Sequence, residues 1–221
     1  MIDTLLQFVA PHYCCECDEV GTLLCENCKY NIIQEPVEAC VVCMQPTGSS
    51  NICPSCKTSY ARAWCVSMRE GGVRTLIDAY KFERSKSASK VLASLLDNSL
   101  PMLPENTVVV PVPTVVKHIR QRGYDHTLLV AKQFAKTRQL RHASLLSRQT
   151  NTVQRGVSKV QRATQAKEAF VAAKTMPHVP ILLIDDVMTT GATLQYAAQA
   201  LVNAGAAEVW VAVIARQQLD K

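Results

Sequence analysis

Two adjacent acids end an apolar run in the stretch ILLIDDVMTTGATL, residues 181–194. The carboxylates of Asp185 and Asp186 repel each other, and removing either from water costs free energy. A chain that places both at the end of a buried strand therefore indicates a site that uses them.

Small hydroxyl residues follow the acids in the segment TTGAT, residues 189–193. Between a strand and a helix, the N–H groups and threonine hydroxyls of this segment can surround a phosphate. Gly191 permits close approach and an unusual φ, and the carboxylates lie one short step away, where they can accept hydrogen bonds from a diol. A ribose 5-phosphate explains both features, whereas one acid and one threonine alone would favour an ordinary strand-to-helix turn.

All ten cysteines lie between residues 14 and 65, and eight form four pairs with a two-residue gap. One such turn aims both sulfurs at the same ion, and two turns complete a tetrahedral thiolate shell. We predict two structural Zn²⁺ sites, paired either sequentially or in a cross-braced manner, without a catalytic role. The predicted ligands are Cys14, Cys17, Cys25, Cys28, Cys40, Cys43, Cys53 and Cys56.

Disulfides and a redox pair are the alternatives for these cysteines. The N-terminal apolar stretch has no basic lead-in, so we expect no secretory signal, no membrane span and a cytoplasmic protein. Because the cytosol keeps thiols reduced, the metal interpretation is favoured. Cys15 and Cys65 are spare, and Cys15 could compete with Cys14 or Cys17 for the first site.

The charge divides the chain into two parts. Residues 1–65 hold 3 Lys/Arg and 7 Asp/Glu, whereas residues 66–221 hold 21 and 11, which gives net charges of −4 and +10. We therefore expect a Cys-rich zinc-binding module over 1–65 and a larger domain over 66–221. The basic domain suits phosphates or nucleic acid, although a solvated basic surface gives the same balance.

Strand and helix patterns alternate along the larger part of the chain. This alternation predicts an α/β fold with a parallel sheet flanked by helices, in which ligands bind beyond the carboxyl ends of the strands. Polar, basic residues 150–168 are expected to form an exposed loop. The expected elements are one or two helices over 73–100, a strand over 107–113, a helix over 123–140, a strand over 179–187, a helix over 193–205 and a strand over 207–216.

The segment 181–193 resembles the phosphoribosyl-pyrophosphate (PRPP) signature of type I phosphoribosyltransferases. The paired cysteines and the blocks DAYKF (78–82), VVVPVPTVVKHIRQRGYDHT (108–127) and TNTVQRGVSKVQRATQAKEAF (150–170) extend the resemblance to the ComF family. That family, also called ComFC or GntX, joins a cysteine zinc module to such a domain. The resemblance implies a type I phosphoribosyltransferase-like domain over 66–221.

The resemblance also implies a role for each matching position. Asp185 and Asp186 would bind the ribose diol, and an acid near the ring would stabilise an oxocarbenium-like transition state. The 5-phosphate would be held by Thr189, Thr190, Gly191, Ala192 and Thr193. The pyrophosphate would be approached by Lys81, Lys117, Arg120 and Arg122, with Mg²⁺ bridging ligand oxygens.

The ComF resemblance further implies assistance to natural transformation, with single-stranded DNA and a DNA-uptake helicase as partners and a possible homodimer. Candidate nucleic-acid contacts are Arg148, Arg155, Lys159 and Arg162. The sequence departs from the family at Asp125-His126, where an Asn-Gln pair is common, and we expect His126 to be a solvated residue at a helix start. Two functions remain open: phosphoribosyl transfer, or DNA binding with a pocket that only regulates it.

Overall fold

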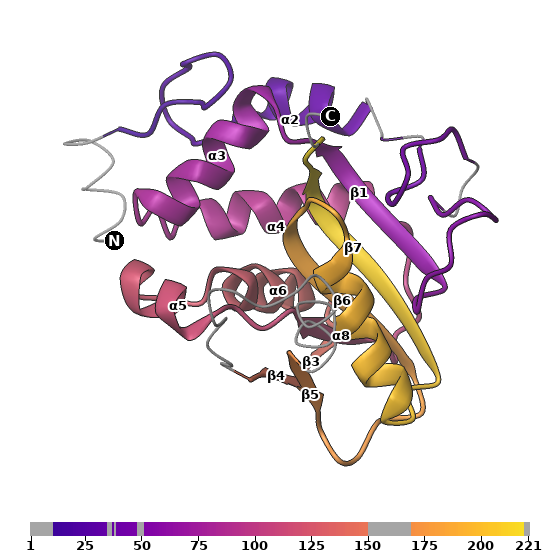
Figure 1. The fold of residues 1–221 in the computed structure, drawn as a ribbon. Coiled ribbons are helices and arrows are strands. Elements are labelled where there is room, and N and C mark those ends of the chain that lie inside the picture. Colours follow the sequence, from indigo (N-terminus) through magenta and orange to yellow (C-terminus); the bar gives the residue numbers. More distant parts are fainter. Residues whose placement is uncertain (1–10, 35–36, 38, 48–50, 150–168, 219–221) are drawn as a thin grey trace, which may run out of the picture.

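A parallel sheet of five strands forms the centre of the computed structural model, which describes residues 11–34, 37, 39–47, 51–149 and 169–218 (Figure 1). The strand order is β1-β7-β6-β2-β3. The bounds are β1 (Arg62–Met68), β2 (Val108–Pro111), β3 (Arg141–His142), β6 (Pro180–Met188) and β7 (Glu208–Arg216). A separate antiparallel pair joins β4 (Leu146–Arg148) to β5 (Phe170–Ala172).

The two longest strands occupy the middle of the described sheet and carry its most apolar sequences. Residues 181–184 of β6 and residues 211–215 of β7 are almost fully buried, as expected for strands covered on both faces. Helices from both sides provide this cover. Their bounds are α2 (Glu26–Gln34), α3 (Gly71–Phe82), α4 (Ala88–Ser99), α5 (Val116–Arg122), α6 (His126–Thr137) and α8 (Ala192–Asn203).

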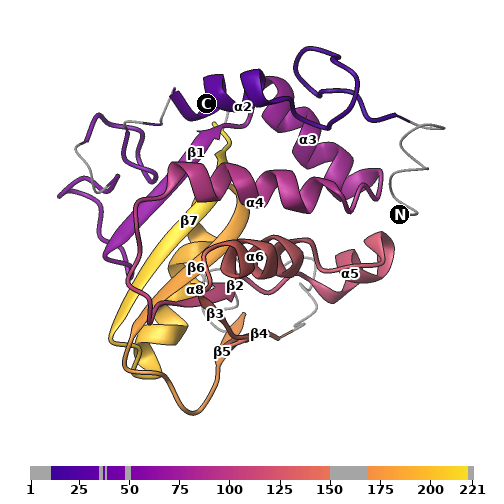
Figure 2. The ribbon, with the colours of Figure 1, turned by 180° about the vertical axis from the view of Figure 1, so that it is seen from behind.

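Alternate residues of β6 enter two different cores. Leu182 and Ile184 pack with α3, α4 and α6, whereas Ile181 and Leu183 pack with α8 and the β4–β5 pair. Figure 1 shows α8 in front of the sheet, and Figure 2, from behind, shows α4 and α6 in front. The predicted α/β class is confirmed, and residues 73–100 form two helices, as one of the two expected arrangements had it.

The cysteine region folds as two copies of one turn. In each copy, the residue before the first cysteine forms an isolated antiparallel β-bridge with the residue seven places later. These bridges pair Tyr13 with Val20 and Ala39 with Pro46. The fifth residue of each turn has a positive φ, at Asp18 and Met44. We call residues 12–28 the first knuckle and residues 39–56 the second knuckle.

The knuckles belong to opposite faces of the sheet. Cys14, Cys25 and Cys28 share the core of α3, α4 and α6, whereas Val41 shares the core of α8. The boundary expected after residue 65 falls inside β1, which pairs with β7 along its whole length. The cysteine region is therefore packed against the sheet in its described parts.

The described part of the chain contains no helix with the length and apolar character needed to cross a bilayer. The expected loop over 150–168, with Arg155, Lys159 and Arg162, lies outside the described residues.

Candidate functional site

A cavity lies between the carboxyl ends of the neighbouring strands β2 and β6. The sheet continues from β2 to β3 on one side of this pair and from β6 to β7 on the other. β2 pairs with β6 only as far as Ile184, and the N–H of Val112 donates to the Ile184 carbonyl at 2.9 Å. Beyond this point β6 keeps β7 as its strand neighbour, so Asp185 and Asp186 stand where β2 has ended. In open α/β sheets this switch in strand order is where ligands bind.

The cavity beside Asp185 has a volume of about 270 Å³. It is bordered by the chain after β2, by the start of α6, by β4 and by the first turn of α8. The lining residues are Val112, Pro113, Thr114, Val115, His118, His126, Thr127, Arg148, Asp185 and Thr193.

Asp185 is the acid that lines this cavity. Its Oδ1 accepts a hydrogen bond from the N–H of Asp186 at 2.9 Å, which satisfies a backbone donor left over where β2 ends. Burial raises the pKa of Asp185, and the negative charge of Asp186 raises it further. A cation or a diol at this carboxylate would relieve both effects.

Asp186 points to the opposite face of β6 and is only 4% exposed. Its Oδ2 lies 2.8 Å from Nζ of Lys81 and 2.9 Å from Nε2 of His126. Although burial opposes ionisation, the hydrogen bond from His126 and the charge of Lys81 hold the pKa of Asp186 below its usual range. The diol role was expected of both acids, and the structure brings only Asp185 to the cavity wall.

His126 connects the buried acid to the cavity and is itself 6% exposed, so the expectation of a solvated residue is wrong. Nη1 of Arg122 lies 2.8 Å from Nδ1 of His126. A guanidinium has only donors, so Nδ1 accepts, and the neutral ring carries its hydrogen on Nε2. The capping acid Asp125, which accepts from the N–H of Leu128 at 3.1 Å, fixes the start of α6 beneath this ring.

The turn after β6 places Thr193 at the cavity and leaves Thr189 and Thr190 exposed. Gly191 precedes α8 with a φ of 78°, and a Cβ there would lie 2.4 Å from Cε of Met188. The positive φ favours glycine, and any larger residue would also have to displace the end of the Met188 side chain. Gly191 has no side chain to cap α8, and the N–H of Ala192 donates to Oγ1 of Thr190 at 3.3 Å. A helix N-terminus of this kind can bind an anion.

The predicted basic residues divide into three positions. Lys81 and Arg122 belong to the network around Asp186, and Arg148 lines the cavity with its guanidinium 5.2 Å from the Phe170 ring centre. Lys117 and Arg120 project from α5, in which no residue is buried. The sequence predicts a nucleic-acid contact for Arg148. In the structure, Arg148 lies on β4, whose pairing with β5 accompanies its position at the cavity wall.

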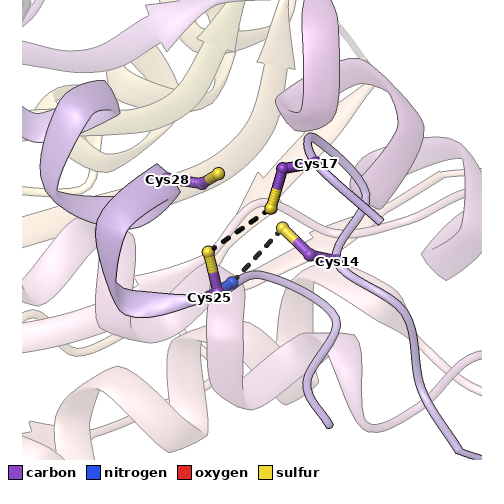
Figure 3. A group of neighbouring side chains, drawn as sticks. All are labelled: Cys14, Cys17, Cys25 and Cys28. Atoms are coloured by element: carbon purple, nitrogen blue, oxygen red, sulfur yellow. Dashed lines mark hydrogen bonds between the residues drawn. The ribbon is translucent and has the colours of Figure 1, made fainter. Parts of the chain in front are cut away.

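The predicted metal ligands form two groups of four sulfurs, each group within 4.8 Å. The pairing is sequential. The groups are Cys14, Cys17, Cys25 and Cys28, and Cys40, Cys43, Cys53 and Cys56 (Figure 3 shows the first).

Sulfur spacing and polar contacts fit Zn²⁺. The sulfurs of Cys17 and Cys25 are 3.7 Å apart, close to the edge of about 3.8 Å that a tetrahedron with Zn–S bonds of about 2.3 Å requires. Burial opposes ionisation of Cys14, yet N–H donors, including that of Cys25 at 3.4 Å, outweigh it and lower the pKa of Cys14 to about 6. Cys40 has a pKa of about 6 for the same reasons.

The two spare cysteines lie outside these groups. Cys15 packs against the core of α3 and α4, and burial raises its pKa. Cys65 is a buried residue of β1 whose thiol donates to the Ser67 carbonyl at 3.2 Å, and burial raises its pKa to about 12. The position of Cys15 outside the first group of sulfurs does not support its competition with Cys14 or Cys17 for the metal.

Glu16, inside the first knuckle, is a contact that sequence reasoning missed. Its carboxylate accepts from the N–H of Gly72 at the start of α3, where Glu70 gives no side-chain cap. A Cβ at Gly72 would lie 3.1 Å from the Glu16 Cα. The glycine pair at 71–72 was the available signal, because it lets the knuckle pack on the helix that carries Lys81.

Comparison with known proteins agrees with this geometry. Residues 91–221 match the family described as Phosphoribosyl transferase domain, and the chain belongs to that family. Competence protein F of Haemophilus influenzae is 31% identical over an alignment of 156 residues. The alignment covers 64% of this chain and 66%, just under two thirds, of that protein. Competence protein ComFC of Streptococcus pneumoniae is 27% identical over an alignment of 198 residues that covers 84% of each chain. With its two cysteine knuckles, the chain is a ComF-family protein with a phosphoribosyl transferase domain.

Two solved structures resemble part of the chain more distantly. Glutamine phosphoribosylpyrophosphate amidotransferase from B. subtilis, complexed with ADP and GMP, is 18% identical with a TM-score of 0.43 and covers 58% of this chain and 26% of its own. A structure of the allosteric regulatory enzyme of purine biosynthesis is 23% identical with the same score and covers 58% and 25%.

Proposed function

We propose that the protein binds PRPP, or another phosphorylated pentose, together with Mg²⁺ in the cavity between β2 and β6. The observation that carries the proposal is that Asp185 and Thr193 border the same cavity. A carboxylate for a diol and a helix N-terminus for a phosphate then lie within the reach of one sugar phosphate.

Asp185 would accept hydrogen bonds from the ribose hydroxyls, and the turn 189–193 would hold the 5-phosphate. Arg148 and His118, on the same cavity wall, would face the pyrophosphate side. Mg²⁺ usually keeps several waters and binds through few carboxylates, and Asp185 is a suitable oxygen ligand for it.

Phosphoribosyl transfer is the reaction that such a site would serve. The acceptor would form a bond to C1 of ribose as the bond from C1 to pyrophosphate breaks, with positive charge on the ring in between. The carboxylate of Asp185 would stabilise that charge.

Ligand protection tests binding, and product release tests transfer. PRPP with Mg²⁺ should raise the midpoint of thermal unfolding, because a ligand at about 100 times its Kd stabilises a protein by about 2.7 kcal/mol. Incubation with PRPP, Mg²⁺ and a panel of nucleobases should then release pyrophosphate for an accepted base. No shift with PRPP or ribose 5-phosphate would contradict the proposal.

The two curated relatives are named as competence proteins, and we extend the proposal to a role in DNA uptake. A specific surface favours direct binding of single-stranded DNA as a second function. Phe82 is 71% exposed, and the Arg122 guanidinium lies 5.8 Å from its ring centre. Lys117 and Arg120 project from α5 nearby in the chain, so bases could stack while phosphates meet cations.

Salt dependence tests this second function. Fluorescence anisotropy with a labelled oligothymidylate should show affinity that falls steeply with salt, since phosphate contacts release counterions. Phe82→Ala should weaken binding at every salt concentration, whereas Lys117→Gln should also reduce the slope by about one contact. Unchanged affinity between low and physiological salt would contradict DNA binding.

A further inference from the structure

Arg216, the last residue of β7, is a buried cation that the sites described above do not use. It is 6% exposed. In the part of the chain that the structure describes, no carboxylate lies within ion-pair distance of it. A buried guanidinium needs compensating partners, so the groups around it indicate what it does.

Its hydrogen bonds join two sites that are far apart in the sequence. Nη1 donates to the Met188 carbonyl at 3.2 Å and to the Gln217 carbonyl at 2.9 Å. Nη2 donates to the Val42 carbonyl at 3.3 Å. Met188 directly precedes the turn 189–193, and Val42 lies between the ligands Cys40 and Cys43 of the second knuckle.

Met188 is well placed to influence that turn. Its carbonyl also accepts from the Gln217 N–H at 2.8 Å, and its side chain fills the space beside Gly191. A shift of Met188 would therefore move the residues proposed to hold the phosphate.

A metal bound at the second knuckle would bring negative charge to the segment that contains Val42. Four thiolates around Zn²⁺ carry a net charge of about −2.

We propose that Arg216 is a positioning residue that couples metal occupancy of the second knuckle to phosphate affinity at the turn 189–193. The metal holds Val42 in place, Arg216 bridges Val42 to Met188, and Met188 supports the turn. The ligand half of this coupling rests on the proposed function, whereas the link between Arg216 and the metal does not.

The first experiment measures metal release alone. Zn²⁺-loaded full-length protein is challenged with a chelator, and release is followed with a chromogenic indicator. Arg216→Gln should release one of two ions about tenfold faster, as expected for the loss of a charge-assisted interaction. Arg216→Lys, which keeps the charge, should release it at nearly the wild-type rate. Arg62→Gln, an exposed arginine at the opposite end of the sheet, is the control.

The second experiment is a double-mutant cycle for ribose 5-phosphate binding, measured by calorimetry. Cys53→Ser empties the second knuckle, and Arg216→Lys removes the planar fork that bridges two carbonyls. Each variant should weaken ribose 5-phosphate binding about tenfold. The double variant should bind ribose 5-phosphate no more weakly than either single variant. Arg216→Lys also keeps the test open if Arg216→Gln does not fold.

Additive losses in the cycle, or wild-type metal release from Arg216→Gln, would overturn the coupling. If the wild-type protein binds no ribose 5-phosphate, the proposed function and the ligand half fail together. Metal release then still decides whether Arg216 stabilises the second knuckle.

Discussion

Nζ of Lys81 lies 2.8 Å from Oδ2 of Asp186. This contact joins the last turn of α3 to the middle strand of the sheet and occupies one of two adjacent acids. The neighbouring carboxylate of Asp185 faces the cavity. The two acids therefore have different tasks: Asp186 holds a buried network, and Asp185 is available to a ligand.

Asp186→Asn should destabilise the fold. The change leaves Lys81 without its carboxylate in a mostly buried position, and breaking such a pair costs about 3 kcal/mol. Urea unfolding followed by circular dichroism measures the loss. Lys81→Met with Asp186→Asn should recover part of it, and a double variant that is less stable than Asp186→Asn would count against the network.

Asp185→Asn should have the opposite effect on stability. The pKa of Asp185 is raised in the folded state, so above the unfolded pKa of about 3.9 its ionisation opposes folding. The variant should be more stable than wild type at pH 7, on the order of 1 kcal/mol, and the difference should vanish below pH of about 4. If both proteins have equal free energies of unfolding from a pH of about 3 to a pH of about 8, the Asp185 carboxylate is well solvated.

Acid should weaken the network around Asp186. A lowered pKa contributes stability that is present above about 3.9 and is lost as the pH falls toward the folded pKa. Wild type should lose more stability than Asp186→Asn when the pH is lowered from about 5 to about 3. Parallel curves for the two proteins would argue against the ion pair.

Emptying the first knuckle should cost more stability than emptying the second. Cys25 packs in the core with Leu92 and Leu96, whereas Cys53 is only partly buried and Cys43 is exposed. Cys25→Ser should therefore lower the free energy of unfolding, and with it the unfolding midpoint, further than Cys53→Ser, with a free-energy difference on the order of several kcal/mol. Zinc content measured on both variants confirms that each has lost one ion, and equal midpoints would contradict the shared core.

Gly191→Ala and Gly205→Ala form a matched pair at positive φ. Both changes place a side chain in the left-handed region, which costs about 1 kcal/mol. Only at Gly191 does a new Cβ meet Met188, since nothing lies within 4 Å at Gly205. Both variants should lose stability, and only Gly191→Ala should lose affinity for ribose 5-phosphate. An equal loss of affinity in both would separate the turn from the ligand.

Local patterns were sufficient for much of the fold. The apolar run 181–184 and the acids after it predict a buried strand and its carboxyl end, because burial and chain direction are visible in the sequence. The repeated Cys-x-x-Cys spacing predicts four-sulfur sites. The choice between sequential and cross-braced pairing depends on how the turns pack, which spacing alone does not determine.

The contacts missed by sequence reasoning are long-range. His126 is 60 residues from Asp186 in the chain, and only the approach of α6 to β6 brings its ring to that carboxylate. Arg216 and Val42 are 174 residues apart. The side-chain alternation of β6 could have separated the roles of Asp185 and Asp186, since adjacent strand residues face opposite sides.

The most direct measurement is calorimetric titration of wild type and Asp185→Asn with PRPP and Mg²⁺. Wild type should bind one PRPP per chain, and the variant should lose at least about tenfold in affinity while it keeps both zinc ions and its fold. Equal affinity in the two proteins, or no heat of binding in the wild type, would contradict the proposed site.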